Sequence, residues 1–317
     1  MEDETNDVLV GRERIVAVDG IELWAEEFGE AEHPAVLLVM GAQAQGVQWN
    51  DGIVRRLVEG GRRVIRYDHR DTGRSSVVDF AVRPYTVADL ASDALAVLDA
   101  CGVERAHLVG ASLGGIIAQR VAVTDPGRVL TLTSLSSQPL GTDTAAAVLR
   151  ALTGAPLEPG ELPPPSTELL TVLAGTLPDP GAGLDGHLAL RLPLWRVLHG
   201  SVLPFEEGEY RAMERRVYER ARDLAAGLNH TLAGAAGGDD TAALASVTAP
   251  TLVLHGTEDP MFPPAHAEAT AAAIPGARLV MIEGLGHTLP TALDGRLAEE
   301  ILRHTGGRET AGPGAAV

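Results

Sequence analysis

The sequence predicts an α/β protein with a mostly parallel sheet of about eight strands, helices on both faces, and an inserted helical block. Two observations predict this architecture. Short apolar runs alternate with helical patterns along most of the 317 residues, as repeated βαβ units require. The alternation stops after residue 138 and resumes near residue 247, and the interval between contains only helical patterns.

The strands are expected first. Two β-rich runs at 14–20 and 21–29 meet at Gly20 and predict an antiparallel hairpin at one edge of the sheet. The run AVLLVM at 35–40 is continuous and apolar, which is typical of a strand buried on both faces. Five later runs follow the same pattern, at 63–68, 106–110, 129–135, 251–256 and 278–284.

Helical patterns separate these strands, at 51–61, 86–102, 113–124 and 265–276. In the second of them apolar residues recur at helical spacing, and Thr86 is placed to cap the first turn.

The interval without strands contains four further helical stretches, at 144–152, 166–177, 189–200 and 207–233. A proline-rich loop at 155–165 separates the first two of them. A helical block inserted between strands of a parallel sheet predicts a cap over their carboxyl ends, where ligands bind in open α/β sheets. We therefore expect a core at 12–138 and 247–305, a cap at 139–246, and flexible tails at 1–11 and 306–317.

Composition excludes several classes of partner. The formal net charge of −18 repels phosphate backbones, so nucleic acid is not an expected partner. No apolar run reaches about 18 residues and the acidic N-terminus does not resemble a signal peptide, so no membrane association is expected. Cys101 is the only cysteine, which excludes an intrachain disulfide and fits a reducing cytoplasm. Its apolar surroundings indicate packing rather than catalysis, and self-association into a homo-oligomer stays open.

A nucleophile is predicted in LVGASLGG at 108–115. Ser112 lies between Gly110 and Gly114, directly after an apolar strand and before a helix, which is the context of a nucleophile elbow. The glycines let strand and helix approach closely, and the helix N-terminus favours a developing oxyanion. The bare pattern is weak and could be an ordinary Gly/Ser turn, but its strand–turn–helix context makes it specific.

A nucleophilic serine needs a base and an acid that orients the base. Asp259 follows a late strand, with Glu258 as the alternative acid. His287 follows the next strand in a glycine-flanked loop, and its alternative role is that of a surface histidine. The order serine, acid, histidine is the one expected for a nucleophile elbow on a parallel sheet.

The oxyanion needs two backbone donors. Leu113 should supply one N–H, and Ala42 the other from the loop after the 35–40 strand, where Gly41 permits the turn. Met40, Trp195 and Leu198 are candidate pocket residues. Trp195 and Leu198, like Tyr210, also have the helical spacing of core residues.

Other polar residues favour structural roles. The loop YDHRDTGRSS at 67–76 could be a second site, but its four charged residues are expected to pair with one another and fix the loop. Those residues are Asp68, Arg70, Asp71 and Arg74. Among the ten histidines, His255 is expected to pack beneath the acid loop. His199 and His230 lie in the expected cap and could touch the substrate, although histidines on a helix face are more often structural. No spacing of histidines or cysteines indicates a metal.

These motifs, in this order, resemble the α/β-hydrolase superfamily. The segments LLVMG, VIRYDHRDTGRS, LWRVLHGSVLPFEEGEY and IEGLGHTLP are more narrowly similar to the aclacinomycin methylesterase group of anthracycline-tailoring enzymes, over roughly residues 14–305. The resemblance implies a triad of Ser112, Asp259 and His287. It also implies oxyanion donors at Leu113 and Ala42, no cofactor, and hydrolysis of a methyl ester on a bulky polyketide.

Two departures bear on this resemblance. Ala42 stands where a second glycine is usual, which a backbone donor tolerates. The proline-rich stretch at 155–165 is distinctive and affects the shape of the pocket, and therefore the substrate.

Rival functions share the triad. They are a broad carboxylesterase, a thioesterase or acyltransferase, and a cofactor-free perhydrolase. A serine at position 112 argues against haloalkane dehalogenases and epoxide hydrolases, which use a carboxylate there. A ligand-binding or cyclising protein on the same fold would be marked by a broken triad, and none is visible in the sequence.

Overall fold

A computed structural model describes residues 9–175, 181–235 and 240–306. Its described residues form an eight-stranded sheet in the order β1-β2-β4-β3-β5-β6-β7-β8. β1 pairs antiparallel with β2, β2 pairs antiparallel with β4, and all other neighbours are parallel. The strands are β1 (Arg12–Val18), β2 (Ile21–Phe28), β3 (Ala35–Val39), β4 (Arg63–Tyr67), β5 (Ala106–Ala111), β6 (Val129–Leu135), β7 (Thr251–Gly256) and β8 (Arg278–Ile282). The predicted fold class is confirmed.

The edge hairpin is confirmed and closes in two residues. Asp19 and Gly20 both have positive φ, at 46° and 74°, and Val18 pairs with Ile21. Two consecutive left-handed residues give a turn whose twist matches that of the flanking strands.

The prediction of doubly buried strands holds for the centre of the sheet and is wrong for β8. β3, β4, β5 and β7 are buried along their whole length. β8 is the last strand of the sheet, Arg278 is exposed, and the next three residues are only half-buried. An edge strand has a neighbour on one side only, so an apolar run does not by itself guarantee burial.

Helices cover both faces of the sheet. α2 (Val87–Ala100), α3 (Leu113–Thr124) and α9 (Ala265–Ala273) contribute to one apolar layer, and the side chain of Thr86 caps α2 as predicted. α1 (Asp51–Glu59) and α10 (Asp294–Thr305) pack together on the other face, through Ile53, Leu57, Leu297 and Ile301. α10 is not among the helices predicted above.

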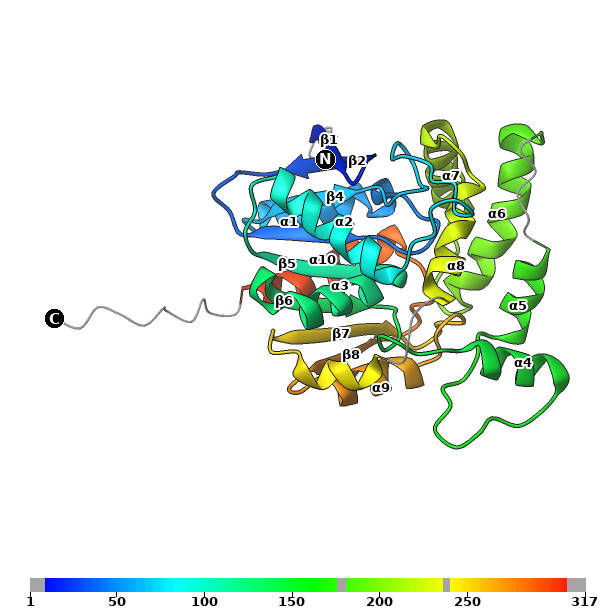
Figure 1. Cartoon of the computed structure of the whole chain (residues 1–317). Helices are drawn as coiled ribbons and strands as arrows, with labels where there is room; N and C mark the ends of the chain where they lie inside the picture. Colours follow the sequence, from blue (N-terminus) through cyan, green and yellow to red (C-terminus); the bar gives the residue numbers. More distant parts are fainter. Residues whose placement is uncertain (1–8, 176–180, 236–239, 307–317) are drawn as a thin grey trace, which may run out of the picture.

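Among the described residues, five α-helices lie between β6 and β7, and Figure 1 shows them grouped beyond one end of the sheet. We call them the cap helices. They are α4 (Ala145–Thr153), α5 (Thr167–Ala174), α6 (Gly183–His199), α7 (Glu207–Arg220) and α8 (Asn229–Ala235). The single helix predicted at 207–233 is wrong. α7 ends at Arg220, where Ala221 turns extended (φ −67°, ψ 132°) and the Arg222 N–H donates to the Gly73 carbonyl. A contact with the core therefore overrides local helix propensity.

The charged loop after β4 has a structural role, but its side chains do not pair with one another as predicted. Arg70 forms a doubly hydrogen-bonded pair with Asp93 of α2, and Arg74 pairs with Glu13 of β1. Asp68 pairs with Arg220 of α7, and Asp71 accepts from Tyr85 and Asn229, the latter at the start of α8. The loop therefore joins the sheet to the cap helices.

The boundaries proposed for core and cap, 12–138, 139–246 and 247–305, stay a prediction. The predicted tails fall mostly on residues 1–8 and 307–317, which lie outside the described residues, as do 176–177 at the end of one predicted cap helix. In the part of the chain that is described, no helix is both long and apolar enough to cross a membrane. Cys101 is buried in the apolar layer beneath α2, and burial raises the pKa of its thiol.

Candidate active site

Ser112 lies at a strained turn between β5 and α3. Its φ of 55° and ψ of −122° fall outside the regions that non-glycine residues normally adopt. A β-carbon on Gly110 would lie 2.0 Å from the Gly114 carbonyl oxygen, and one on Gly114 would lie 2.1 Å from that of Val39. The two glycines therefore allow the close approach of strand and helix that exposes the serine hydroxyl.

The structure brings Ser112, His287 and Asp259 together. His287 Nε2 lies 3.0 Å from Ser112 Oγ, and His287 Nδ1 lies 2.8 Å from Asp259 Oδ2. When Nδ1–H donates to the carboxylate, Nε2 has a free lone pair to accept the serine proton. Ser112, His287 and Asp259 follow β5, β8 and β7, so the carboxyl ends of three parallel strands bring them to one point.

Asp259 is buried and held in place by the loop that follows it. Its Oδ1 accepts from the Met261 and Phe262 N–H groups at 2.9 and 2.8 Å. Burial alone would raise the pKa of Asp259, but the charge and hydrogen bond of His287, with help from His255 and the Phe262 N–H, bring it below its usual value. The carboxylate is therefore ionised at neutral pH.

Glu258, the alternative acid, points elsewhere. Its Oε2 lies 3.4 Å from the hydroxyl of Ser201, at the edge of the cap. Of the two adjacent acids, Asp259 is the one in contact with His287.

The two expected oxyanion donors lie beside Ser112. Leu113 is the first residue of α3, where an N–H has no acceptor within the helix. A β-carbon on Gly41 would lie 3.2 Å from that of Ser112, so the loop carrying Ala42 adjoins the nucleophile. Across the described residues, neither N–H donates to another group.

Two buried histidines hold the loop that carries Ala42. His69 Nε2–H donates to the Met40 carbonyl at 2.9 Å, and His230 Nδ1 accepts from the Gln43 N–H at 3.0 Å. Burial and the neighbouring His230 lower the pKa of His69 to about 3, and burial also lowers that of His230. Both rings are therefore neutral at physiological pH, the state that His230 needs in order to accept. His230 lies on α8, so this loop is tied to the cap as well as to the core.

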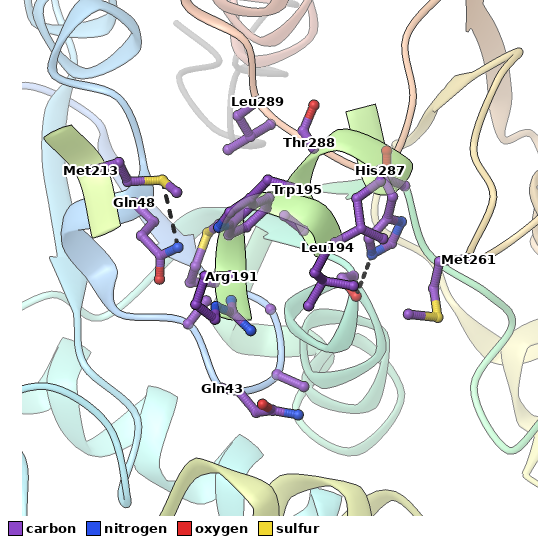
Figure 2. Close-up of a pocket in the computed structure, with 18 of the residues that line it drawn as sticks. Gln43, Gln48, Arg191, Leu194, Trp195, Met213, Met261, His287, Thr288 and Leu289 are labelled. Carbon is purple, nitrogen blue, oxygen red and sulfur yellow. Dashed lines mark hydrogen bonds between the residues drawn. The ribbon is translucent and has the colours of Figure 1, made fainter. Parts of the chain in front are cut away.

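Above Ser112 and His287 lies a cavity of about 260 Å³, bounded by the sheet on one side and by the cap on the other. This volume approaches the lower end of the range for small-molecule sites. Figure 2 shows His287 and Met261 on one side of the view and Gln48 and Met213 on the other, with a segment of α6 between them. Its lining includes the three predicted pocket residues Met40, Trp195 and Leu198.

Comparison with known proteins agrees with this geometry. The alpha/beta hydrolase fold family matches residues 34–290. The chain belongs to the alpha/beta hydrolase family. It is 41% identical over 292 residues to the rhodomycin D methylesterase DauP of Streptomyces sp. (strain C5), covering 92% of this chain and 97% of the relative. The same values hold for the rhodomycin D methylesterase DnrP of Streptomyces peucetius.

A solved hydrolase from Pseudomonas aeruginosa PA01 superposes with a TM-score of 0.69 at 28% identity, covering 94% of this chain and 100% of that one. The predicted superfamily and the narrower resemblance to anthracycline methylesterases are both confirmed.

The remaining predicted histidines of this hydrolase have structural contacts. His199 bonds to the Tyr210 hydroxyl at 2.7 Å inside the cap, and His255 Nε2–H donates to the Phe262 carbonyl beneath the acid loop. Within the described ranges, no group of three or more histidine, cysteine, aspartate or glutamate side chains is arranged to hold a metal ion.

Most of the cavity lining was not predicted from the sequence, and two polar residues in it, Ser136 and Arg191, are of chemical interest. Ser136 follows β6 with a φ of 44°, and its buried hydroxyl has no hydrogen-bond partner in the described part of the chain. Its position one residue after an apolar strand of a parallel sheet could have identified it as a cavity residue. Arg191 lines the cavity from α6, four residues before Trp195. Its helical spacing from Trp195 and Leu198 could have identified it.

Proposed function

We propose that this chain is a serine esterase that hydrolyses a methyl ester on an anthracycline-type polyketide through an acyl-enzyme. The observation that carries the chemistry is the line of contacts from Ser112 through His287 to Asp259 at the floor of the cavity. The family membership and the methylesterase relatives confirm the prediction of an ester-hydrolysing enzyme.

The roles follow from the contacts. His287 Nε2 removes the hydroxyl proton as Ser112 Oγ attacks the ester carbonyl carbon. The N–H groups of Leu113 and Ala42 stabilise the oxyanion, while Asp259 holds the His287 ring and stabilises its charged form. His287 then protonates the departing methoxide, and methanol leaves. Water, deprotonated by His287, hydrolyses the acyl-enzyme and releases the carboxylic acid.

The substrate class rests on the relatives and on the cavity. Two rhodomycin D methylesterases match nearly the whole chain, cap included. The cavity wall is largely apolar, with leucine, methionine and tryptophan side chains from α6 and α7, as a polycyclic acyl group requires. A broad carboxylesterase, a thioesterase or acyltransferase and a perhydrolase would use the same contacts at Ser112, so substrate assays must separate them.

We further propose a cytoplasmic location, a small-molecule ester as substrate, and no binding of nucleic acid or membranes. Self-association into a homo-oligomer stays open. A ligand-binding or cyclising protein with little hydrolysis is the alternative outside esterases.

The deciding experiment incubates wild type and Ser112→Ala with a carbomethoxy-bearing anthracycline and follows the products by mass spectrometry. We expect free acid, or its decarboxylated product, from wild type only, with a loss of about 10⁴-fold or more in the variant and unchanged folding by circular dichroism. If wild type hydrolysed p-nitrophenyl acetate normally but did not convert the anthracycline, the proposed substrate would be refuted and the assignment as an esterase would stand. Substantial turnover by Ser112→Ala would refute the nucleophile.

A further inference from the structure

Helix α6 places a cation, Arg191, on the wall of the cavity. Its Nε–H donates to Glu214 Oε1 at 3.0 Å, and its guanidinium lies 5.3 Å from the centre of the Trp195 ring. Nη1 and Nη2 have no hydrogen-bond partner among the residues described. A guanidinium has five N–H donors, so four of them remain for a ligand.

Glu214 fixes the orientation of this guanidinium. The carboxylate is fully buried on α7 and accepts from three groups, His187 Nε2, Arg191 Nε and Trp195 Nε1. Burial would raise the pKa of Glu214, but Arg191, His187 and Trp195 lower it to about 2. Because Glu214 binds only the Nε edge, the two terminal amino groups are left for the cavity.

The helix also sets how far Arg191 lies from the reacting group. Arg191, Leu194, Trp195 and Leu198 form one stripe of α6, and the Leu198 carbonyl accepts from the His287 N–H at 2.6 Å. Seven residues at helical rise place Arg191 about 10 Å along the axis from Leu198. Figure 2 shows Arg191 beside Trp195, apart from His287, with its nitrogens toward Gln43.

The residues that line the cavity between Arg191 and His287 suit a flat apolar ligand. Leu194, Met213 and Leu228 line the cavity, and Trp195 stacks on Tyr210 with ring centres 5.6 Å apart. A fatty acyl chain would bring no acceptor to Arg191 and would desolvate its amino groups without replacing their hydrogen bonds. Because Glu214 already balances the charge of Arg191, neutral or partly charged oxygens suit the site.

We propose that Arg191 is a specificity-determining residue that donates to carbonyl or phenolic oxygens on the distal ring of a planar, fused-ring acyl group. Glu214 acts through Arg191 as a positioning residue. The inference rests on the proposed function for the placement of the ester at Ser112, but the binding of the distal ring can be measured without that ester.

The test measures binding of quinizarin, a dihydroxyanthraquinone without an ester, by fluorescence titration of wild type, Arg191→Met and Arg191→Lys. Anthracene serves as the flat ligand without oxygens. The lysine variant retains a cation for Glu214 but loses the planar fork. We expect the Kd of quinizarin to rise about tenfold to a hundredfold in both variants, since hydrogen bonds to a charged group are lost. The Kd of anthracene should change by less than about twofold.

Two controls keep the outcome interpretable. Arg196→Lys alters an exposed arginine of the same helix, paired with Glu207, and should bind quinizarin as wild type does. Circular dichroism and thermal unfolding check that both Arg191 variants are folded under the assay conditions.

Two results would overturn the proposal. One is an unchanged Kd for quinizarin, and the other is an equal weakening of quinizarin and anthracene binding, which would indicate a purely structural arginine. Wild type could bind quinizarin in an Arg191-dependent manner and yet fail to hydrolyse an anthracycline methyl ester. That result would refute the proposed function and leave the role of Arg191 intact.

Discussion

The two sides of the cavity are built differently. On the core side, Ser112, His287 and Asp259 contact one another directly, at the ends of three parallel strands. On the cap side, α6 presents an apolar stripe with one cation, and that cation is held by Glu214 of the next helix.

The difference lies in what holds each side in place. The turn at Ser112 depends on two glycines within two residues of it, and the Asp259 carboxylate on N–H groups two and three residues later. The cap-side contacts join residues far apart in the chain, such as Arg191 with Glu214 and Arg220 with Asp68. We therefore expect core-side changes to affect every ester, and cap-side changes to discriminate between esters.

The largest effect in this comparison is expected for the acid of the proposed triad. Asp259→Asn keeps the shape but favours the wrong tautomer of His287, so kcat should fall by about 10⁴-fold for both large and small esters. Steady-state kinetics with an anthracycline methyl ester and p-nitrophenyl acetate measures this. Glu258→Gln is the matched control and should retain wild-type rates; the reverse result would assign the acid to Glu258.

A smaller effect, still shared by both esters, is expected at His230, which ties the loop carrying Ala42, a proposed oxyanion donor, to the cap. His230→Ala leaves the Gln43 N–H without its acceptor and loosens this loop, so kcat should fall about tenfold. His304→Ala is the control, because this α10 histidine bonds to the Leu132 and Pro250 carbonyls and does not line the cavity. A loss restricted to the polycyclic ester would place His230 with the cap-side residues instead.

Cap-side changes should separate the substrates. Leu194→Ala removes a buried side chain from the cavity wall, and KM for the polycyclic ester should rise about fivefold while p-nitrophenyl acetate is unaffected. Leu152→Ala, on the exposed side of α4, should change neither value. Equal losses for both esters would contradict the division between the two sides.

The smallest effect on turnover is expected at Asp294, which bonds to Asn50 behind the core side of the cavity. Burial raises the pKa of Asp294 to about 6, above its value in the unfolded chain, so the folded state binds this proton more tightly. This contribution to stability is complete below about pH 4 and is lost as pH rises through about 6.

Asp294→Asn should therefore unfold less readily than wild type above about pH 6, by about 2–3 kcal/mol, with little difference below about pH 4. Urea unfolding across this pH range measures the difference, with kcat as the control. If the free energy of unfolding changed with pH in the same way for wild type and Asp294→Asn, the raised pKa of Asp294 would be contradicted.

Features encoded by short segments could be predicted from the amino-acid sequence. Two β-rich runs that meet at Gly20 predicted the edge hairpin, and six continuous apolar runs predicted the other strands. Thr86 predicted a helix cap, and glycines around Ser112 predicted the strained turn. Each depends on backbone preferences and burial patterns within about ten residues, which are readable without knowing the neighbours. Glycine spacing and strand order likewise identified Ser112, Asp259 and His287 as candidates for the triad.

Which side chains contact one another became clear from the three-dimensional packing of the chain. It separated Asp259 from Glu258 by direction, gave the charged loop partners on β1, α2 and the cap, and ended α7 at Arg220. It also oriented Arg191 through Glu214, a residue 23 positions away. The physical reason is that ion pairs and edge positions depend on elements brought together by packing, and the local sequence carries no record of the partner.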